Sequence, residues 1–132
     1  MINLGKMNAL INKLSDEPFK YGTSDCFTFT SALVAAWHGT GSTYRMLHQY
    51  KNKKEALKYL ASYGGIEALT TGTLGYSRKT PELCEDGDVV TAEVAPGDMA
   101  LGFVFDGHGL FKTKTRVIKM SLKKCSKGWR MS

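Results

Sequence analysis

Cys26 is the side chain of this sequence that is best placed for covalent chemistry. It follows a glycine-bearing loop, Tyr21-Gly22-Thr23-Ser24-Asp25, and begins an apolar-periodic segment that predicts a helix. A thiol in the first turn of a helix feels the partial positive charge of the unpaired backbone N–H groups, which favours the reactive thiolate. The placement indicates a nucleophile, with Ser24 or Asp25 expected to cap the helix. The alternative is that Cys26 is a small buried hydrophobic residue.

A cysteine nucleophile also needs a base, which catalytic cysteines normally find in a nearby histidine. The chain has 3 histidines. His108 is kept as a candidate base, although it lies in a predicted turn. His38 ends the helix that Cys26 begins, roughly 18 Å away at about 1.5 Å per residue, and is better explained as a favourable cation at a helix C-terminus. His48 lies in the middle of the chain and is expected to be exposed.

The elements that must position these groups follow from hydrophobic periodicity. Helical spacing predicts helices over residues 3–14, 26–37, 44–50 and 53–63, with a further turn over 66–69. Residues 71–86 are rich in Gly, Thr and charge and predict a loop. Strand-like patterns then cover residues 88–94, 99–105, 110–120 and 128–131, with a hairpin turn at Asp106-Gly107-His108-Gly109.

Helices followed by antiparallel strands define an α+β fold, in which helices pack on one face of a sheet. We expect a single domain over residues 1–132. Its helical part covers residues 1–70, its loop 71–86, and its small antiparallel sheet 87–132.

The cysteine content and the apolar segments indicate which compartment and which cofactors to expect. The 3 cysteines, Cys26, Cys84 and Cys125, are odd in number and have no zinc-site spacing. We therefore expect a reducing compartment, no disulfide, no metal and no cofactor. The N-terminus has no apolar signal segment, and no stretch approaches the roughly 20 apolar residues of a membrane span. Neither export by its own signal nor a membrane anchor is expected.

Charge is unevenly distributed along the chain, whose net charge is +6. Half of the acidic residues lie between residues 82 and 98, and none follows Asp106. The cations after that point are Lys112, Lys114, Arg116, Lys119, Lys123, Lys124, Lys127 and Arg130. They are either solvated lysines beside complementary strands or a docking face for an acidic partner. The binding residues predicted are Tyr21, Asp25, Lys112, Lys114, Arg116, Lys123 and Lys124.

Three segments together resemble the NlpC branch of the papain-like cysteine peptidases. They are residues 19–29 around Asp25-Cys26, the segment Gly87-Asp88-Val89-Val90, and the segment Ala100-Leu101-Gly102-Phe103-Val104. The resemblance extends to a small phage tail-associated branch of that family with a Trp-Arg ending, here Gly128-Trp129-Arg130. It implies an NlpC-type papain-like domain in which Cys26 stands at the nucleophile position.

The chain departs from that family at the base. The family's His-Val-Gly-Ile strand corresponds here to Ala100-Leu101-Gly102-Phe103, so a methyl group stands where the base is expected. The strand rise of about 3.3 Å per residue carries His108 roughly 20 Å beyond Ala100 along an extended strand. General acid–base catalysis contributes typically about 10²–10⁴-fold, so its loss predicts feeble activity at most.

Three functions remain open. The first is a phage virion component of the tail or its assembly pathway, made in the host cytoplasm, whose catalytically degenerate scaffold binds other virion proteins. The second is an active hydrolase on peptidoglycan stem peptides, as the wider family implies. The third is a nucleic-acid binder that uses the basic C-terminal residues, ranked last because Lys outnumbers Arg there and no aromatic residues are interleaved.

Overall fold

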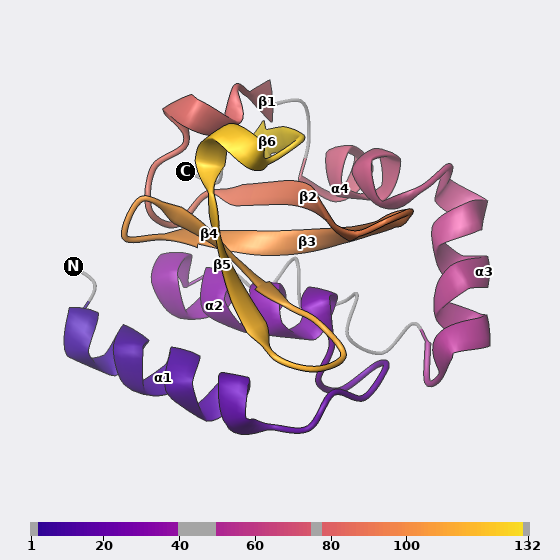
Figure 1. The fold of residues 1–132 in the computed structure, drawn as a ribbon, viewed down its shortest axis with the longest axis horizontal. Coiled ribbons are helices and arrows are strands. Elements are labelled where there is room, and N and C mark those ends of the chain that lie inside the picture. Colours follow the sequence, from indigo (N-terminus) through magenta and orange to yellow (C-terminus); the bar gives the residue numbers. More distant parts are fainter. Residues whose placement is uncertain (1–2, 40–49, 75–77, 131–132) are drawn as a thin grey trace.

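The computed structural model describes residues 3–39, 50–74 and 78–130. In the described part of the chain, four α-helices precede the six strands (Figure 1). The helices are α1 (Leu4–Asp16), α2 (Cys26–His38), α3 (Lys53–Tyr63) and α4 (Ile66–Leu74). The strands are β1 (Arg78–Lys79), β2 (Val89–Ala95), β3 (Asp98–Phe105), β4 (His108–Lys112), β5 (Val117–Ser121) and β6 (Lys127–Trp129). Two short 3-10 helices are η2 (Pro81–Leu83) and η3 (Leu122–Lys124).

The helix boundaries follow from local capping chemistry. Asn3 and Asn52 each accept a backbone N–H from the first turn of α1 and α3, which satisfies donors that a helix start otherwise leaves unpaired. Gly39 and Gly64 end α2 and α3 at φ 72° and 87°, the left-handed conformation that glycine adopts at low cost. Among the described residues, no helix has the length and apolar character needed to cross a bilayer.

The strands form one antiparallel sheet in the order β1-β6-β2-β3-β4-β5. Its central hairpin pairs β2 with β3, so that Ala92 lies opposite Ala100 and Val90 opposite Gly102. The last strand of the chain, β6, enters between β1 and β2. The α+β fold with N-terminal helices and a C-terminal antiparallel sheet is therefore confirmed.

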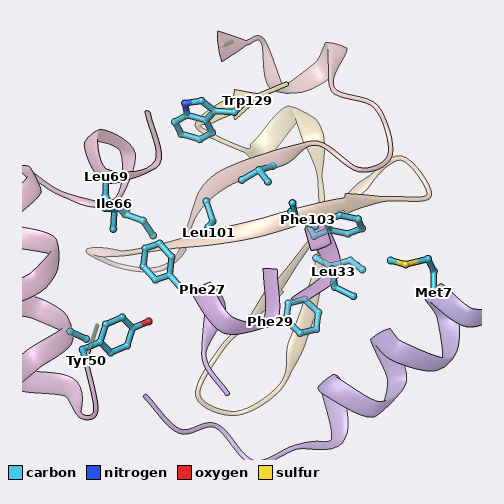
Figure 2. Close-up of a cluster of buried hydrophobic side chains, with 14 residues drawn as sticks. Met7, Phe27, Phe29, Leu33, Tyr50, Ile66, Leu69, Leu101, Phe103 and Trp129 are labelled. Atoms are coloured by element: carbon cyan, nitrogen blue, oxygen red, sulfur yellow. The ribbon is translucent and has the colours of Figure 1, made fainter. Parts of the chain in front are cut away.

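A hydrophobic core lies between the helices and one face of the sheet. Helix α2 contributes Phe27, Phe29 and Leu33 to it, and the sheet contributes Leu101 and Phe103 (Figure 2). Burying a large apolar side chain of this kind stabilises the folded state by about 1.5–3 kcal/mol. The almost continuous apolar sequence of α2 is explained by its position at the centre of this core.

A second, smaller core lies on the other face of the sheet. Along β3 and β4, its residues alternate with those of the first core. Its members are Cys84, Val90, Ala92, Ala100, Val104 and Phe111, all buried. A Cβ on Gly102 would come within 2.5 Å of the Phe111 ring, so the ring lies directly against the glycine backbone. The β3 strand is apolar on both sides because it contributes to both cores.

Three expected elements differ from the structure. The segment 110–120 forms two strands, since Thr113 closes a turn in which its backbone N–H and Oγ1 donate to the Arg116 carbonyl at 2.8 and 2.7 Å. Helix α4 continues to Leu74, into the expected loop, which also holds β1 and η2. The helix expected over 44–50 falls largely outside the described residues, and Tyr50 itself has no regular structure.

Candidate functional site

The loop before α2 is folded so that Cys26 starts the helix in a fixed position. Lys20 and Ser24 exchange backbone hydrogen bonds of 3.0 and 2.8 Å across the loop. Asp25 then caps α2 in a reciprocal arrangement: its Oδ1 accepts from the Thr28 N–H at 2.9 Å, and its own N–H donates to Thr28 Oγ1 at 2.7 Å. This capping box confirms the predicted helix start.

The second carboxylate oxygen of Asp25 joins two other parts of the chain. Asp25 Oδ2 accepts from the backbone N–H of Gly22 at 2.8 Å and from the Tyr50 hydroxyl at 2.7 Å. Asp25 is 2% exposed. Burial and the adjacent Asp25 carboxylate raise the pKa of Tyr50, so the phenol remains a neutral donor. Asp25 Oδ1 therefore caps α2, and Oδ2 fixes the loop and Tyr50 relative to the helix start.

A mainly apolar pocket opens beside Cys26. Its cavity volume is about 100 Å³. Helix α2, helix α3 and the β2–β3 hairpin all contribute to its walls. The apolar lining residues are Phe19, Tyr21, Cys26, Phe27, Tyr50, Ala56, Leu57, Leu60, Ile66, Val94, Met99 and Ala100. The polar ones are Asp25, Asp98, Lys112, Thr113 and Lys114. A cavity of this size accommodates one side chain or a small apolar group.

The Cys26 thiol is neutral in this environment. Its residue is partly exposed as a whole, but it packs against both hydrophobic cores. Burial raises the pKa of the thiol to about 12, the Asp25 and Asp98 carboxylates add to the rise, and a backbone hydrogen bond from Leu101 opposes it. The expectation that the helix N-terminus favours the thiolate is therefore not met, because desolvation outweighs the helix dipole here.

Among the described residues, no imidazole lies beside Cys26. Ala100 lines the pocket together with Cys26 and is 4% exposed. Every lining residue of the pocket in the described part of the chain is something other than histidine. The side chain at position 100 is a methyl group, which cannot accept a proton.

The described histidines have structural partners elsewhere. His108 pairs with Phe105 at the other end of β3 from Ala100, roughly 17 Å away at about 3.3 Å per residue, and its Nδ1 donates to the Asp106 carbonyl at 2.9 Å. His38 Nε2 donates to the Gly87 carbonyl at 2.8 Å from the far end of α2. His48 falls outside the described residues. The structure thus does not bring Cys26 and the candidate base His108 together.

The predicted binding residues separate into two groups. Tyr21 and Asp25 lie at the pocket, as does the buried Lys112, and burial raises the pKa of the Tyr21 phenol. Exposed positions on the β4–β5 turn and on η3 hold Lys114, Arg116, Lys123 and Lys124.

Lys112 differs most from its predicted role. Its side chain is 4% exposed, and its ammonium donates to the Leu14 and Glu17 carbonyls at 2.5 and 2.8 Å and to Ser24 Oγ at 2.5 Å. Burial lowers the pKa of Lys112. Its three protons are all used to hold the end of α1 against the loop before α2, so Lys112 is not part of the exposed basic face.

Sequence reasoning did not find the structural role of Tyr50, since it lies 25 positions from Asp25 along the chain and leaves no local signal. It also did not find Glu67, whose Oε2 accepts from Thr91 Oγ1 at 3.0 Å and from Ser126 Oγ at 2.9 Å and so links α4 to the sheet. Across the described residues, no three His, Cys, Asp or Glu side chains converge in a way that could hold a metal ion.

The helix that begins at Cys26 packs on an antiparallel sheet, with Cys26 beside the β2–β3 hairpin, and this arrangement matches the papain-like fold of the NlpC/p60 type. The solved structure titled "Crystal structure of NlpC/p60 domain of peptidoglycan hydrolase SagA" is similar to this chain with a TM-score of 0.57 and 13% sequence identity, and the match covers 98% of this chain and 100% of that one. At this identity the similarity establishes the fold.

The chain belongs to the family described as "Domain of unknown function (DUF6950)", which matches residues 5–131. No curated protein matches the chain.

Proposed function

We propose that this chain is a non-catalytic binding domain, which keeps the NlpC/p60 fold and has lost its hydrolase chemistry. The observation that carries the proposal is that Cys26 and Ala100 line one pocket, with no imidazole among the described lining residues. General acid–base groups contribute about 10²–10⁴-fold to catalysis. Without a histidine, the thiol lacks the group that normally takes its proton and then protonates the leaving amine in cysteine hydrolases.

The state of the thiol supports the same conclusion. A thiol with a pKa of about 12 has almost no thiolate at neutral pH. Asp25, the residue before Cys26 and one of the polar residues that line the pocket, has its two oxygens occupied by Gly22, Thr28 and Tyr50. The Asp-Cys motif is accounted for by the helix cap and by the packing of the two cores.

We further propose that the binding partner is another phage virion protein and that the chain acts in a tail or in tail assembly. The support is the resemblance of the sequence to a phage tail-associated branch, including the ending Gly128-Trp129-Arg130. In this chain Trp129 is fully buried, and its Nε1 donates to Thr71 Oγ1 at 3.1 Å. The motif therefore has a structural role, which a binding protein retains when catalysis is lost.

Peptidoglycan cleavage is the experiment that tests the loss of activity. Purified chain and the Cys26→Ala variant are incubated with cell-wall fragments, and released stem peptides are measured by mass spectrometry. We expect no release by either protein above a blank without protein. Release by the wild-type chain that disappears in Cys26→Ala would overturn the proposal and establish the alternative, an active peptidoglycan hydrolase.

The virion role is tested separately. Phage particles produced with a tagged copy of the chain are purified and analysed by mass spectrometry, and tail assembly is compared with and without the chain. We expect the chain either in the particles or as a requirement for tails. Normal particles that neither contain nor require it would overturn the virion role and leave the non-catalytic assignment intact.

A further inference from the structure

Strand β5 ends the sheet, and β4 is its one strand neighbour in the described part of the chain. In an antiparallel pair, alternate backbone N–H and C=O groups of each strand point away from the partner. An edge strand therefore presents a row of hydrogen-bonding groups that another extended chain can pair with. Val117–Ser121 provides such a row.

The same edge is strongly basic. The exposed cations on β5, on the turn before it and on η3 after it are Lys114, Arg116, Lys119, Lys123 and Lys124. The salt bridge found among the described residues joins Lys79 to Asp88, and none of these five cations takes part in it. Among the described residues, no ion pair joins these five cations to the acidic segment 82–98, so their charge is available to a partner.

The two faces of β5 differ in chemistry. Ile118 and Met120 are half-buried and pack against the second core, on the same side as Phe111. Lys119 projects to the opposite face and is exposed, while Val117 on that face is half-buried and packs against the first core. A chain added beside β5 would place alternate side chains next to Ile118 and Met120 and the intervening ones next to Lys119. The edge therefore favours a segment in which apolar and acidic residues alternate.

We infer that β5 is a docking edge for an extended, acidic segment of a partner protein, which adds to the sheet as a further antiparallel or parallel strand. This inference rests on the proposed binding function and names its surface and the chemistry of its partner. Lys114 continues the basic edge to the rim of the Cys26 pocket. The docked segment would thus run along β5 from the pocket rim toward η3.

A nucleic acid partner and a purely protective role of the lysines lead to different expectations. A nucleic acid would use the cations but not the strand edge, because phosphates have no pattern of alternating donors and acceptors to pair with a backbone. Lysines on an edge strand also prevent aggregation between sheets, and in that case they need no partner. The strand edge and the alternation of its faces favour the peptide.

The test uses a synthetic dye-labelled peptide of alternating Glu and Val, about seven residues long to match β5 with one residue beyond each end. Binding to the full chain is measured by fluorescence anisotropy at low and at high salt. Three controls accompany it: a scrambled peptide of the same composition, the alternating peptide with alternate backbone nitrogens methylated, and a single-stranded oligonucleotide. Methylation removes the backbone donors and leaves the charge unchanged.

We expect saturable binding of the alternating peptide that weakens at high salt, with at least about tenfold weaker binding of the methylated and scrambled peptides. Lys119→Glu should weaken binding about tenfold, because an opposite-charge cross-strand pair becomes a like-charge pair. The matched control Lys58→Glu, an exposed lysine of α3, should leave binding unchanged. Amide exchange should slow in β5 when the peptide is bound.

Equal binding of all three peptides, or tighter binding of the oligonucleotide, would overturn the strand-addition inference. No binding of any peptide, with increased aggregation of Lys119→Glu, would establish that the lysines only protect the edge. None of these results bears on peptidoglycan cleavage, so a failure here is distinguishable from a failure of the non-catalytic assignment.

Discussion

The Tyr50 hydroxyl donates a 2.7 Å hydrogen bond to Asp25 Oδ2, and this bond ties the segment before α3 to the residue that caps α2. Both side chains are almost fully buried, at 3% and 2% exposure. The carbonyl of Tyr50 also lies where a Cβ on Gly22 would be, and Gly22 has φ 86°. The loop that presents Cys26 is therefore fixed by packing as well as by its own sequence.

Asp25→Ala should lower the free energy of unfolding by about 3 kcal/mol. The substitution removes the helix cap, which is worth about 0.5–2 kcal/mol, and leaves the Tyr50 hydroxyl and the Gly22 N–H buried without an acceptor, at about 1–3 kcal/mol each before relaxation. Urea unfolding followed by circular dichroism measures the change. Tyr50→Phe removes one hydrogen bond and should cost about 1 kcal/mol. Equal losses for the two variants would show that Asp25 has no capping role.

Cys26 should react slowly with alkylating reagents in the folded chain. A thiol with a pKa of about 12 has a thiolate fraction about a thousandfold below that of an ordinary thiol at pH 8. Pulses of iodoacetamide, followed by peptide mass spectrometry, give the rate at Cys26 and at the partly exposed Cys125 in one sample. The Cys26 rate should increase about tenfold per pH unit. Rapid alkylation at pH 7 would contradict a neutral, desolvated thiol.

The stability of the chain should fall above about pH 9. The pKa of Cys26 is raised to about 12 in the folded state, and an unfolded thiol titrates near 8.5. Between these values the unfolded state loses its proton first, so the free energy of unfolding decreases by up to about 1.4 kcal/mol per pH unit from this group. Below about pH 8.5 the contribution is constant. Cys26→Ala should flatten the slope, and an unchanged slope would assign the effect to other groups.

Lys112→Met should destabilise the chain by about 2–3 kcal/mol, because the Leu14 and Glu17 carbonyls and Ser24 Oγ lose a charged donor. Methionine keeps the length and apolar stem of the side chain. The matched control is Lys119→Met, at an exposed position, which should change stability by less than about 0.5 kcal/mol. Thermal unfolding of both variants measures the difference, and equal effects would exclude an anchoring role for Lys112.

The parts of this fold that could be predicted are those with local signals. Helix α2 has a capping residue, an apolar sequence and a terminal glycine within the fifteen positions from Asp25 to Gly39, so its start is where it was expected and its end lies one residue later. The β4–β5 turn has no Gly or Pro and closes through Thr113 instead. Without such a residue, the sequence over 110–120 looks like one long strand.

The site could be predicted only where its residues are close together along the chain. Asp25 and Cys26 are adjacent, so their place at the helix start was foreseeable. The Tyr50 contact and the burial of Lys112 depend on segments 25 to 98 residues away. The thiol pKa could not be predicted either, because a helix start alone suggests a lowered value, and desolvation by two cores is a property of the tertiary structure.

Ala100→His should activate Cys26. Ala100 and Cys26 line one cavity of about 100 Å³, and an imidazolium within about 4–6 Å of a thiol favours the thiolate and lowers its pKa. We expect alkylation of Cys26 at pH 7 to accelerate at least about tenfold, with a new inflection near the histidine pKa of about 6.5. The matched control is Ala100→Leu, which crowds the cavity without a base. Melting temperatures establish that both variants fold, and equal alkylation rates for the two would show that position 100 cannot deliver a base to Cys26.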